Sequence, residues 1–345
     1  MVRKVRKKKQ GIPLSRALPL LVIMAAIVYG FILTPGTPPI FEEEYNDKTS
    51  SYSSIKLSPD SSEDRTRPVS PSKRKTDPAV FISPNKLKSP CAILVRLKDH
   101  TIQLDNRSSE KVYPASLTKM MTALVAIENL PNLKEKIRLT HTAFQGMDEA
   151  DASMAGFQPG EQVRAIDLLY GVMLPSGAEC CIGLADQIAG SEQDFVKLMN
   201  QKAADIGMKS THFENATGLH HENHYTTVND LAILLSYALQ NDTYREIFTS
   251  SRHSIPPTNK HPDGITLYST LFEELNHQDI RGGEISGGKT GYTQEAGLCL
   301  ASLAQVGKQE YILITAGAQG DHYSEQYNFT DALAVYGSIS STAID

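Results

Sequence analysis

Cysteine is scarce in this sequence, with four residues in a chain of 345. Cys180 and Cys181 are adjacent, Cys91 and Cys299 stand in apolar runs, and no C-x-x-C pair occurs. Neighbouring cysteines rarely pair with each other, and four cysteines are too few for a disulfide framework in a domain of this size. We therefore expect buried structural thiols. The missing C-x-x-C pairs exclude a zinc ribbon, and we expect no metal and no other cofactor.

Acidic residues are missing from the start of the chain, where none precedes Glu42. The chain has 34 Lys and Arg against 39 Asp and Glu, and seven of the basic residues fall within the first 16 positions. Without those seven, 27 basic residues face 39 acidic ones. The body is therefore acidic, which argues against a nucleic-acid partner and leaves the basic segment 1–16 to be explained separately.

Residues 17–34, ALPLLVIMAAIVYGFILT, form a run of 18 residues without a charge directly after that basic segment. This is about the length that a helix needs to cross a bilayer. The following TPGTPPIF has no A-x-A-like cleavage site, which favours an uncleaved signal-anchor helix over a signal peptide. By the positive-inside rule we expect a single-pass protein of the cell membrane, with its N-terminus cytoplasmic and its body extracytoplasmic.

Residues 35–85 are rich in Ser, Pro, Asp, Lys and Thr and have few apolar residues to bury. Such a composition predicts a disordered linker. Residues 86–345 then form the one globular domain. In it, strand patterns at 91–97 and 101–106 precede helical patterns at 116–129, 165–174, 179–189, 192–207 and 227–241, and strands return at 283–293, 296–306 and 310–318 before a last helix at 327–336. Strands at both ends around a helical middle predict an α+β domain.

Ser116 and Lys119 stand three apart at the start of the helical run in YPASLTKMMTALVAIENL. Residues at this spacing share one face of a helix, so the two side chains can touch. A serine hydroxyl is a weak nucleophile until a base removes its proton, and lysine can be that base only when burial or a nearby positive charge lowers its pKa. S-x-x-K alone often arises by chance, and without support it indicates only a helix with a polar first turn.

Two further motifs give that support. Ser176 lies in LPSGAEC between two helical segments, and Lys289 lies in GGKTGYT within a strand-rich segment. S-x-x-K, a middle motif with serine, and K-T-G are together the signature of serine β-lactamases and penicillin-binding proteins. The order and the separations fit, with 60 residues from Ser116 to Ser176 and 113 from Ser176 to Lys289.

From about Cys91 to Tyr336 the chain resembles the serine D-alanyl-D-alanine carboxypeptidases, which are low-molecular-mass penicillin-binding proteins of the peptidase S11 family. LPSGAE, THFENATGL and GGKTGYTQEAGLCLA contribute to this resemblance. The chain is also similar to the membrane-anchored carboxypeptidases that accompany VanD-type vancomycin resistance. The resemblance implies a serine β-lactamase/DD-peptidase-like fold, in which an antiparallel sheet from both chain ends carries a mostly helical inserted subdomain. Some relatives have a carboxy-terminal anchor, and the short sequence after Tyr336 predicts that the amino-terminal run anchors this chain instead.

The resemblance also implies the partners. The substrate is a peptidoglycan stem peptide that ends in D-Ala-D-Ala or D-Ala-D-Lac, β-lactam antibiotics are covalent inhibitors, and the cytoplasmic membrane holds the chain. The motifs do not decide between D-alanine and D-lactate, because this specificity depends on the shape of the pocket.

Roles for individual residues follow by motif. The resemblance implies that Ser116 is the nucleophile, Lys119 its base and Ser176 a proton relay to the leaving amine. Lys289 helps to position the terminal carboxylate and supports the proton path, Thr290 and Thr293 add hydroxyl contacts, and backbone N–H groups of Ser116 and Tyr292 form the oxyanion hole. At Gly291, a side chain would crowd a substrate that lies along the strand.

The middle motif departs from the family pattern Ser-x-Asn, because its third position is Ala178. In the family, the usual asparagine contacts the substrate backbone and the catalytic lysine. Ala178 can make neither contact, so we expect weaker binding of the substrate backbone and one contact fewer to orient Lys119. Glu179 follows, and nothing in the sequence makes it a substitute.

Other polar clusters are less informative. In HHENHY, His221 and His224 lack the two-residue gap of H-E-x-x-H zinc sites, so we expect a loop near the active site without a metal. Asn215 in ENATG matches the glycosylation pattern, but the resemblance predicts a structural turn.

Two alternatives of other classes remain. A β-lactamase would share the nucleophile and the lysine, although the chain has no S-D-N and no clear counterpart of the glutamate that activates the deacylating water. The other is a catalytically weak β-lactam or cell-wall sensor, which Ala178 makes conceivable.

Overall fold

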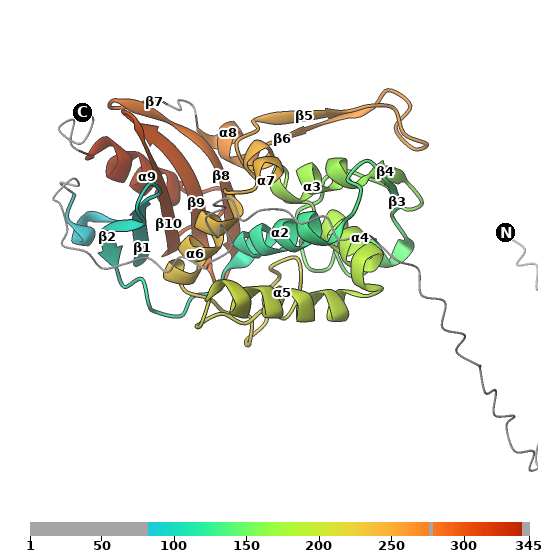
Figure 1. The fold of residues 1–345 in the computed structure, drawn as a ribbon, viewed down its shortest axis with the longest axis horizontal. Coiled ribbons are helices and arrows are strands. Elements are labelled where there is room, and N and C mark those ends of the chain that lie inside the picture. The colour runs from blue at the N-terminus through green and yellow to red at the C-terminus, as the bar shows by residue number, and fades with distance from the viewer. Residues whose placement is uncertain (1–81, 276–278, 340–345) are drawn as a thin grey trace, which may run out of the picture. The chain divides into compact units, whose positions relative to one another are not determined.

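A six-stranded antiparallel sheet dominates the computed structural model, which describes residues 82–275 and 279–339. The strand order is β2-β1-β10-β9-β8-β7, so strands from the two ends of the described chain lie side by side at β1 and β10 (Figure 1). The strands are β1 (Cys91–Arg96), β2 (Thr101–Asn106), β7 (Asp279–Ile280), β8 (Gly283–Thr293), β9 (Gly297–Val306) and β10 (Gln309–Ala318). This confirms the predicted sheet from both chain ends.

The sheet is covered on both faces, since its central strands β1, β9 and β10 are buried at consecutive positions rather than at every second one. Ile93 pairs with Ile314, and both belong to the core under α2 (Lys119–Asn129) and α6 (Val228–Ala238). The neighbouring pair, Leu94 and Leu313, belongs to the core under α9 (Tyr327–Gly337). Side chains alternate between the faces of a strand, so each pair supplies a different layer. Figure 1 shows α9 on one side of the sheet and the larger helical group on the other.

The helices occupy the middle of the chain, as the sequence predicts. Side-chain caps fix three helix starts. The side chains of Ser191, Thr227 and Asn241 accept hydrogen bonds from the backbone N–H groups of Asp194, Asp230 and Tyr244. The α-helices are α2 (Lys119–Asn129), α3 (Ala165–Met173), α4 (Ala178–Ala189), α5 (Glu192–Ile206), α6 (Val228–Ala238), α7 (Asp242–Phe248), α8 (Thr270–Glu274) and α9 (Tyr327–Gly337). The α+β class is confirmed.

The first predicted helix begins later than expected. Residues 115–118 form a 3-10 turn, η3 (Ala115–Thr118), and α2 starts only at Lys119. Ala115 has a left-handed φ of 46°, a conformation that cannot continue into a regular α-helix. Ser116 therefore lies in a tight turn and not in an α-helix.

Two small antiparallel strand pairs and four short helical elements were not predicted. The pairs join β3 (Lys136–Arg138) to β4 (Gln162–Arg164) and β5 (Arg252–Ile255) to β6 (Ile265–Tyr268). The helices α7 and α8 and the 3-10 turn η4 (His141–Phe144) were also missed, and a further 3-10 turn, η2 (Pro84–Lys86), precedes β1. These elements are short, which leaves little periodicity to detect.

All four cysteines are buried free thiols, as predicted. The predicted basic segment 1–16, the anchor helix 17–34 and nearly all of the linker 35–85 lie outside the described residues, so this division of the chain stays a prediction. Within residues 82–275 and 279–339, no helix has both the length and the apolar character that a membrane span requires.

Candidate active site

The η3 turn brings Ser116 and Lys119 into contact. Lys119 Nζ donates a hydrogen bond to Ser116 Oγ over 3.1 Å. In a 3-10 turn, side chains three residues apart eclipse one another, so this backbone aligns the pair more directly than an α-helix would. The predicted contact between the two side chains is confirmed, although the local geometry differs from the prediction.

Lys119 is only 2% exposed although it carries an amine. Its Nζ also donates to the carbonyl oxygen of Thr217 over 2.6 Å. Burial is the main cause that lowers the pKa of Lys119, and the nearby Cys181, Glu179 and Cys180 oppose this effect. A buried amine with a lowered pKa and a serine within reach has the properties required of a general base.

The loop that carries Thr217 is fixed by one side chain. Asn215 Oδ1 accepts hydrogen bonds from the backbone N–H groups of Thr217 and Gly218 and from the Thr217 hydroxyl. Gly218 has a φ of 83°, and a Cβ there would lie 1.9 Å from Ala115 O. Only glycine fits, and the loop packs directly on the η3 turn. Asn215 thus forms the predicted structural turn.

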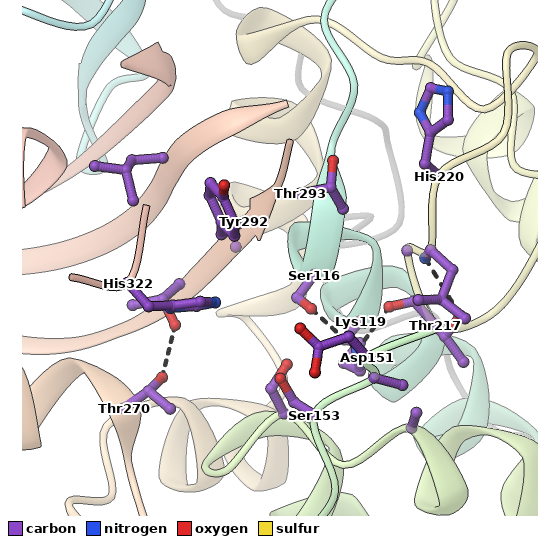
Figure 2. Close-up of a pocket in the computed structure, with 18 of the residues that line it drawn as sticks. Ser116, Lys119, Asp151, Ser153, Thr217, His220, Thr270, Tyr292, Thr293 and His322 are labelled. Carbon is purple, nitrogen blue, oxygen red and sulfur yellow. Dashed lines mark hydrogen bonds between the residues drawn. The ribbon is translucent and has the colours of Figure 1, made fainter. Parts of the chain in front are cut away.

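A cleft with a volume of about 520 Å³ opens beside Ser116 and is shown in Figure 2. Ser116, Lys119 and Ser176 all line it. Ser176 is 4% exposed, has a left-handed φ of 67°, and its buried Oγ has no hydrogen-bond partner among the described residues. Strained backbone at a non-glycine residue is typical of functional sites. An unpartnered hydroxyl in the cleft is available to a ligand.

Strand β8 forms one wall of the cleft, through Thr290, Gly291, Tyr292 and Thr293. Among the described strands, β7 pairs only with the start of β8, and the rest of β8 pairs with β9 alone. The edge of β8 at the cleft is therefore free to pair with an extended peptide.

Gly291 has a different reason for being glycine than the one predicted. A Cβ at this position would lie 3.0 Å from the Ser116 nitrogen and 3.2 Å from the Leu117 nitrogen. The side chain would thus crowd the backbone of the η3 turn itself. The small residue lets β8 approach the serine closely.

The hydroxyls of this wall have partners. Thr290 Oγ1 shares a hydrogen bond of 2.7 Å with Thr270 Oγ1, and Thr293 Oγ1 accepts the Ala296 N–H over 3.1 Å. The Tyr292 ring meets the His322 ring edge-on, with 4.8 Å between the centroids. Thr270 and His322 were not found from the sequence, because nothing in their local sequence indicates a site.

Lys289 does not line the cleft, although it is on the same face of β8 as Gly291. It is fully buried, and its Nζ donates to Thr290 O over 2.8 Å. Burial, followed by the nearby charge of Lys119, lowers the pKa of Lys289 well below its usual value. The predicted role of this amine toward the substrate carboxylate stays a prediction.

Ala178 lines the cleft at the first turn of α4, and Glu179 points away from it. Glu179 Oε1 accepts the backbone N–H groups of Ala155, Gly156 and Phe157 over 2.8, 3.1 and 3.4 Å. Glu179 is thus a support for the loop beside the cleft and does not replace the missing asparagine.

The histidine-rich loop lies near the site, as predicted. His220 lines the cleft, and His224 is buried. His224 Nδ1 accepts the Glu214 N–H over 3.4 Å, so its proton is on Nε2 and reaches Thr118 Oγ1 over 2.9 Å. Burial lowers the pKa of His224 to about 3, and nearby histidines add to the shift. This neutral imidazole connects the loop to the η3 turn.

A family model described as Peptidase S11, D-alanyl-D-alanine carboxypeptidase, matches residues 78–320. The chain belongs to this family. The match covers the η3 turn, Ser176 and β8, which are the parts of the chain that the fold brings to the cleft.

Named S11 relatives agree with this result. The D-alanyl-D-alanine carboxypeptidase DacF of Bacillus subtilis is 32% identical over 231 residues, which cover 66% of this chain and 57% of the relative. DacC of Escherichia coli is 31% identical over 280 residues, which cover 75% of this chain and 65% of the relative. The chain thus spans less than two thirds of the length of these relatives.

Solved structures support the DD-peptidase fold. The crystal structure of the Streptomyces K15 DD-transpeptidase matches with a TM-score of 0.66 at 25% identity, over 74% of this chain and 99% of that one. The D-alanyl-D-alanine carboxypeptidase of Mycobacterium tuberculosis shares the fold, with a TM-score of 0.64 at 23% identity over 77% of this chain and 96% of that one. The predicted fold is therefore confirmed.

Proposed function

We propose that this protein is a serine D-alanyl-D-alanine carboxypeptidase, which removes the terminal residue of peptidoglycan stem peptides through an acyl-serine. The observation that carries the proposal is the hydrogen bond between Lys119 Nζ and Ser116 Oγ in a cleft bounded by the free edge of β8. Membership of the S11 family supports the substrate class.

The first step is activation of the serine. Burial favours the neutral form of Lys119, and a neutral amine can accept the Ser116 proton while its own N–H stays on Thr217 O. Ser116 Oγ then attacks the carbonyl carbon of the penultimate residue. The developing negative charge on the carbonyl oxygen is stabilised by the backbone N–H groups of Ser116 and Tyr292.

The second step expels the terminal residue. Ser176 relays a proton to its amine, which suits the unpartnered hydroxyl on the wall of the cleft. Lys289 supports this proton path, because its charge is coupled to that of Lys119. Water then hydrolyses the acyl-serine and restores the Ser116 hydroxyl.

The test uses the full chain and a peptide that ends in D-Ala-D-Ala. The wild-type protein should release D-alanine and form a covalent adduct with a fluorescent penicillin, while Ser116→Ala should do neither. Lys119→Ala should impair both reactions and keep the circular dichroism of the wild type. A penicilloyl adduct on Ser116→Ala, seen by mass spectrometry, would show that another residue is the nucleophile.

The same experiment separates the alternatives. Rapid loss of the penicilloyl group would indicate a β-lactamase, and penicillin binding without peptide turnover would indicate a sensor. Turnover of peptides ending in D-lactate, measured beside those ending in D-alanine, decides the specificity that the motifs leave open.

We also propose that residues 17–34 hold the protein in the cell membrane, with residues 1–16 cytoplasmic and the domain outside. The uncharged run and its basic flank support this topology. Protease added to intact cells should digest residues 35–85 and release the domain; full protection would contradict the proposal. A contribution to vancomycin resistance rests on the resemblance to VanD-type carboxypeptidases alone, and a change in the inhibitory concentration of vancomycin on deletion would test it.

A further inference from the structure

A carboxypeptidase must recognise the free carboxylate at the end of its substrate, and this inference rests on the proposed function. Among the described residues that line the cleft, the basic side chains are Lys119, His220 and His322, and none is arginine. Lys119 is occupied by Ser116 Oγ and Thr217 O, and Lys289 is fully buried and does not line the cleft. The two histidines are therefore the remaining candidates for a cationic contact with the carboxylate.

His220 already has an acidic neighbour. Its Nδ1 lies 3.8 Å from Glu295 Oε2, and its ring meets Tyr113 edge-on at 4.7 Å. A charge on His220 would therefore be balanced within the protein. A substrate carboxylate placed there would also meet the Glu295 carboxylate, which repels it.

His322 has a different setting, in the exposed connection between β10 and α9. Its ring rests on Tyr292, and Figure 2 shows the ring extending into the cleft toward the side where Ser116 lies. Tyr292 and Thr290 are two residues apart on β8, so they share one face of the strand. His322 therefore lies beside the face that carries the Thr290 hydroxyl.

Thr290 can donate its own proton to a ligand. Its Oγ1 shares a hydrogen bond with Thr270 Oγ1, and either hydroxyl can be the donor. When Thr270 donates, the Thr290 proton is free to reach a carboxylate oxygen. An N–H group of the His322 ring and the Thr290 hydroxyl, which lie beside one another, then offer one donor to each oxygen of a carboxylate.

We propose that His322 binds the terminal carboxylate of the substrate together with the Thr290 hydroxyl. Tyr292 supports the His322 ring through the edge-on contact between the two rings. Acidic side chains also act on this histidine. Asp321 and Glu325 lie on the same connection, and Asp151, Glu274 and Glu295 line other parts of the cleft. His322 is a substrate-binding residue in this proposal and takes no part in the proton transfers.

The test compares His322→Gln and His322→Lys with the wild type, and His220→Gln is the matched control at the other cleft histidine. On a peptide with a free terminal carboxylate, His322→Gln should raise KM roughly tenfold and change kcat little, because a hydrogen bond to a charged group is lost. His322→Lys should keep a low KM, and His220→Gln should resemble the wild type.

Two further measurements separate charge recognition from a structural effect. On the same peptide with a terminal carboxamide, the wild type and His322→Gln should have equal KM values, because no charge remains to be recognised. On the carboxylate peptide, added salt should raise the KM of the wild type and of His322→Lys more than that of His322→Gln, because salt screens a contact between charges.

The outcomes are distinct. An unchanged KM in His322→Gln, or an equal rise for the carboxylate and the carboxamide peptide, would overturn the role of His322. A rise in KM for His220→Gln alone would give the role to the other histidine and overturn the proposal. If the wild type releases no terminal residue but still binds penicillin, the carboxypeptidase function is wrong and the inference falls with it.

Discussion

The two walls of the cleft are held in place by different means. The β8 wall is a strand fixed by its backbone ladder to β9, from Gly283 to Thr293. The facing wall consists of loops, and single polar side chains fix them. Glu179 holds residues 155–157, and Asn215 holds Thr217 and Gly218. On the strand wall, a larger side chain is excluded because there is no room for it. On the loop wall, a side chain is required because it supplies the hydrogen-bond acceptor that holds the backbone.

The largest effect is expected on the strand wall. Gly291→Ala places a methyl group 3.0 Å from the Ser116 nitrogen, so either β8 or the η3 turn must shift. A small displacement of the nucleophile should lower kcat/KM by about 100-fold, or about 2.7 kcal/mol, with little change in thermal stability. Glu284→Ala, an exposed position on the same strand, is the control. Wild-type kinetics in Gly291→Ala would show that space does not limit this wall.

On the loop wall, we expect the loss of a hydrogen-bond acceptor to lower the stability of the protein. Glu179→Ala leaves the N–H groups of Ala155, Gly156 and Phe157 without their acceptor, which should cost about 2 kcal/mol of unfolding free energy. Glu179→Gln keeps an amide oxygen in place and should cost less. Urea denaturation of both variants measures the difference. Equal losses would mean that the charge of Glu179 matters and its acceptor oxygen does not.

His224 should make the loop wall sensitive to acid. Because its pKa is about 3 in the folded protein and an ordinary histidine titrates near 6.5, the unfolded chain binds the extra proton between these values. Stability should therefore fall as the pH drops from about 6.5 toward 3, by at most about 1.4 kcal/mol per pH unit from this residue. His224→Gln should remove this part of the slope, and His220→Gln should keep it. Parallel slopes in the wild type and in His224→Gln would contradict the assignment.

The smallest effect is expected at Ala178, at the start of the loop wall. This residue is 1% exposed and packs in an apolar cluster with Ala143, Met147 and Ile182. Ala178→Asn brings the amide of the usual family motif, but the amide must enter this cluster or push into the cleft. We expect kcat/KM to fall by a factor of about 2 to 10. A rise in kcat/KM would instead show that the natural enzyme lacks a useful contact.

The sequence predicts the strand wall better than the loop wall. The long elements of residues 165–173 and 228–238 and the strands β8 to β10 have clear periodicity or continuous apolar runs. The motifs also indicate that Ser116, Ser176 and Gly291 belong to one site. Local sequence is sufficient here, because a strand and a helix specify their own geometry.

The loop wall depends on contacts between residues far apart in the chain. Thr118 meets His224 across 106 positions, and Lys119 meets Thr217 O across 98. His322 reaches Tyr292 from beyond two strands. The left-handed backbone at Ala115 could not be predicted either, since alanine has no intrinsic preference for it. Such features arise only when the whole domain packs.

The pairing of β1 with β10 also constrains the order of folding. Cys91 to Arg96 pair with residues 311–316, and Asp331 accepts the N–H groups of Lys88 and Ser89. A ribosome that has delivered residues 91–106 must complete most of the domain before their partner strand emerges. Until then the first hairpin has a bare edge, and the chain stays in an incompletely folded state. The domain would complete its folding only after β10 emerges and pairs with β1.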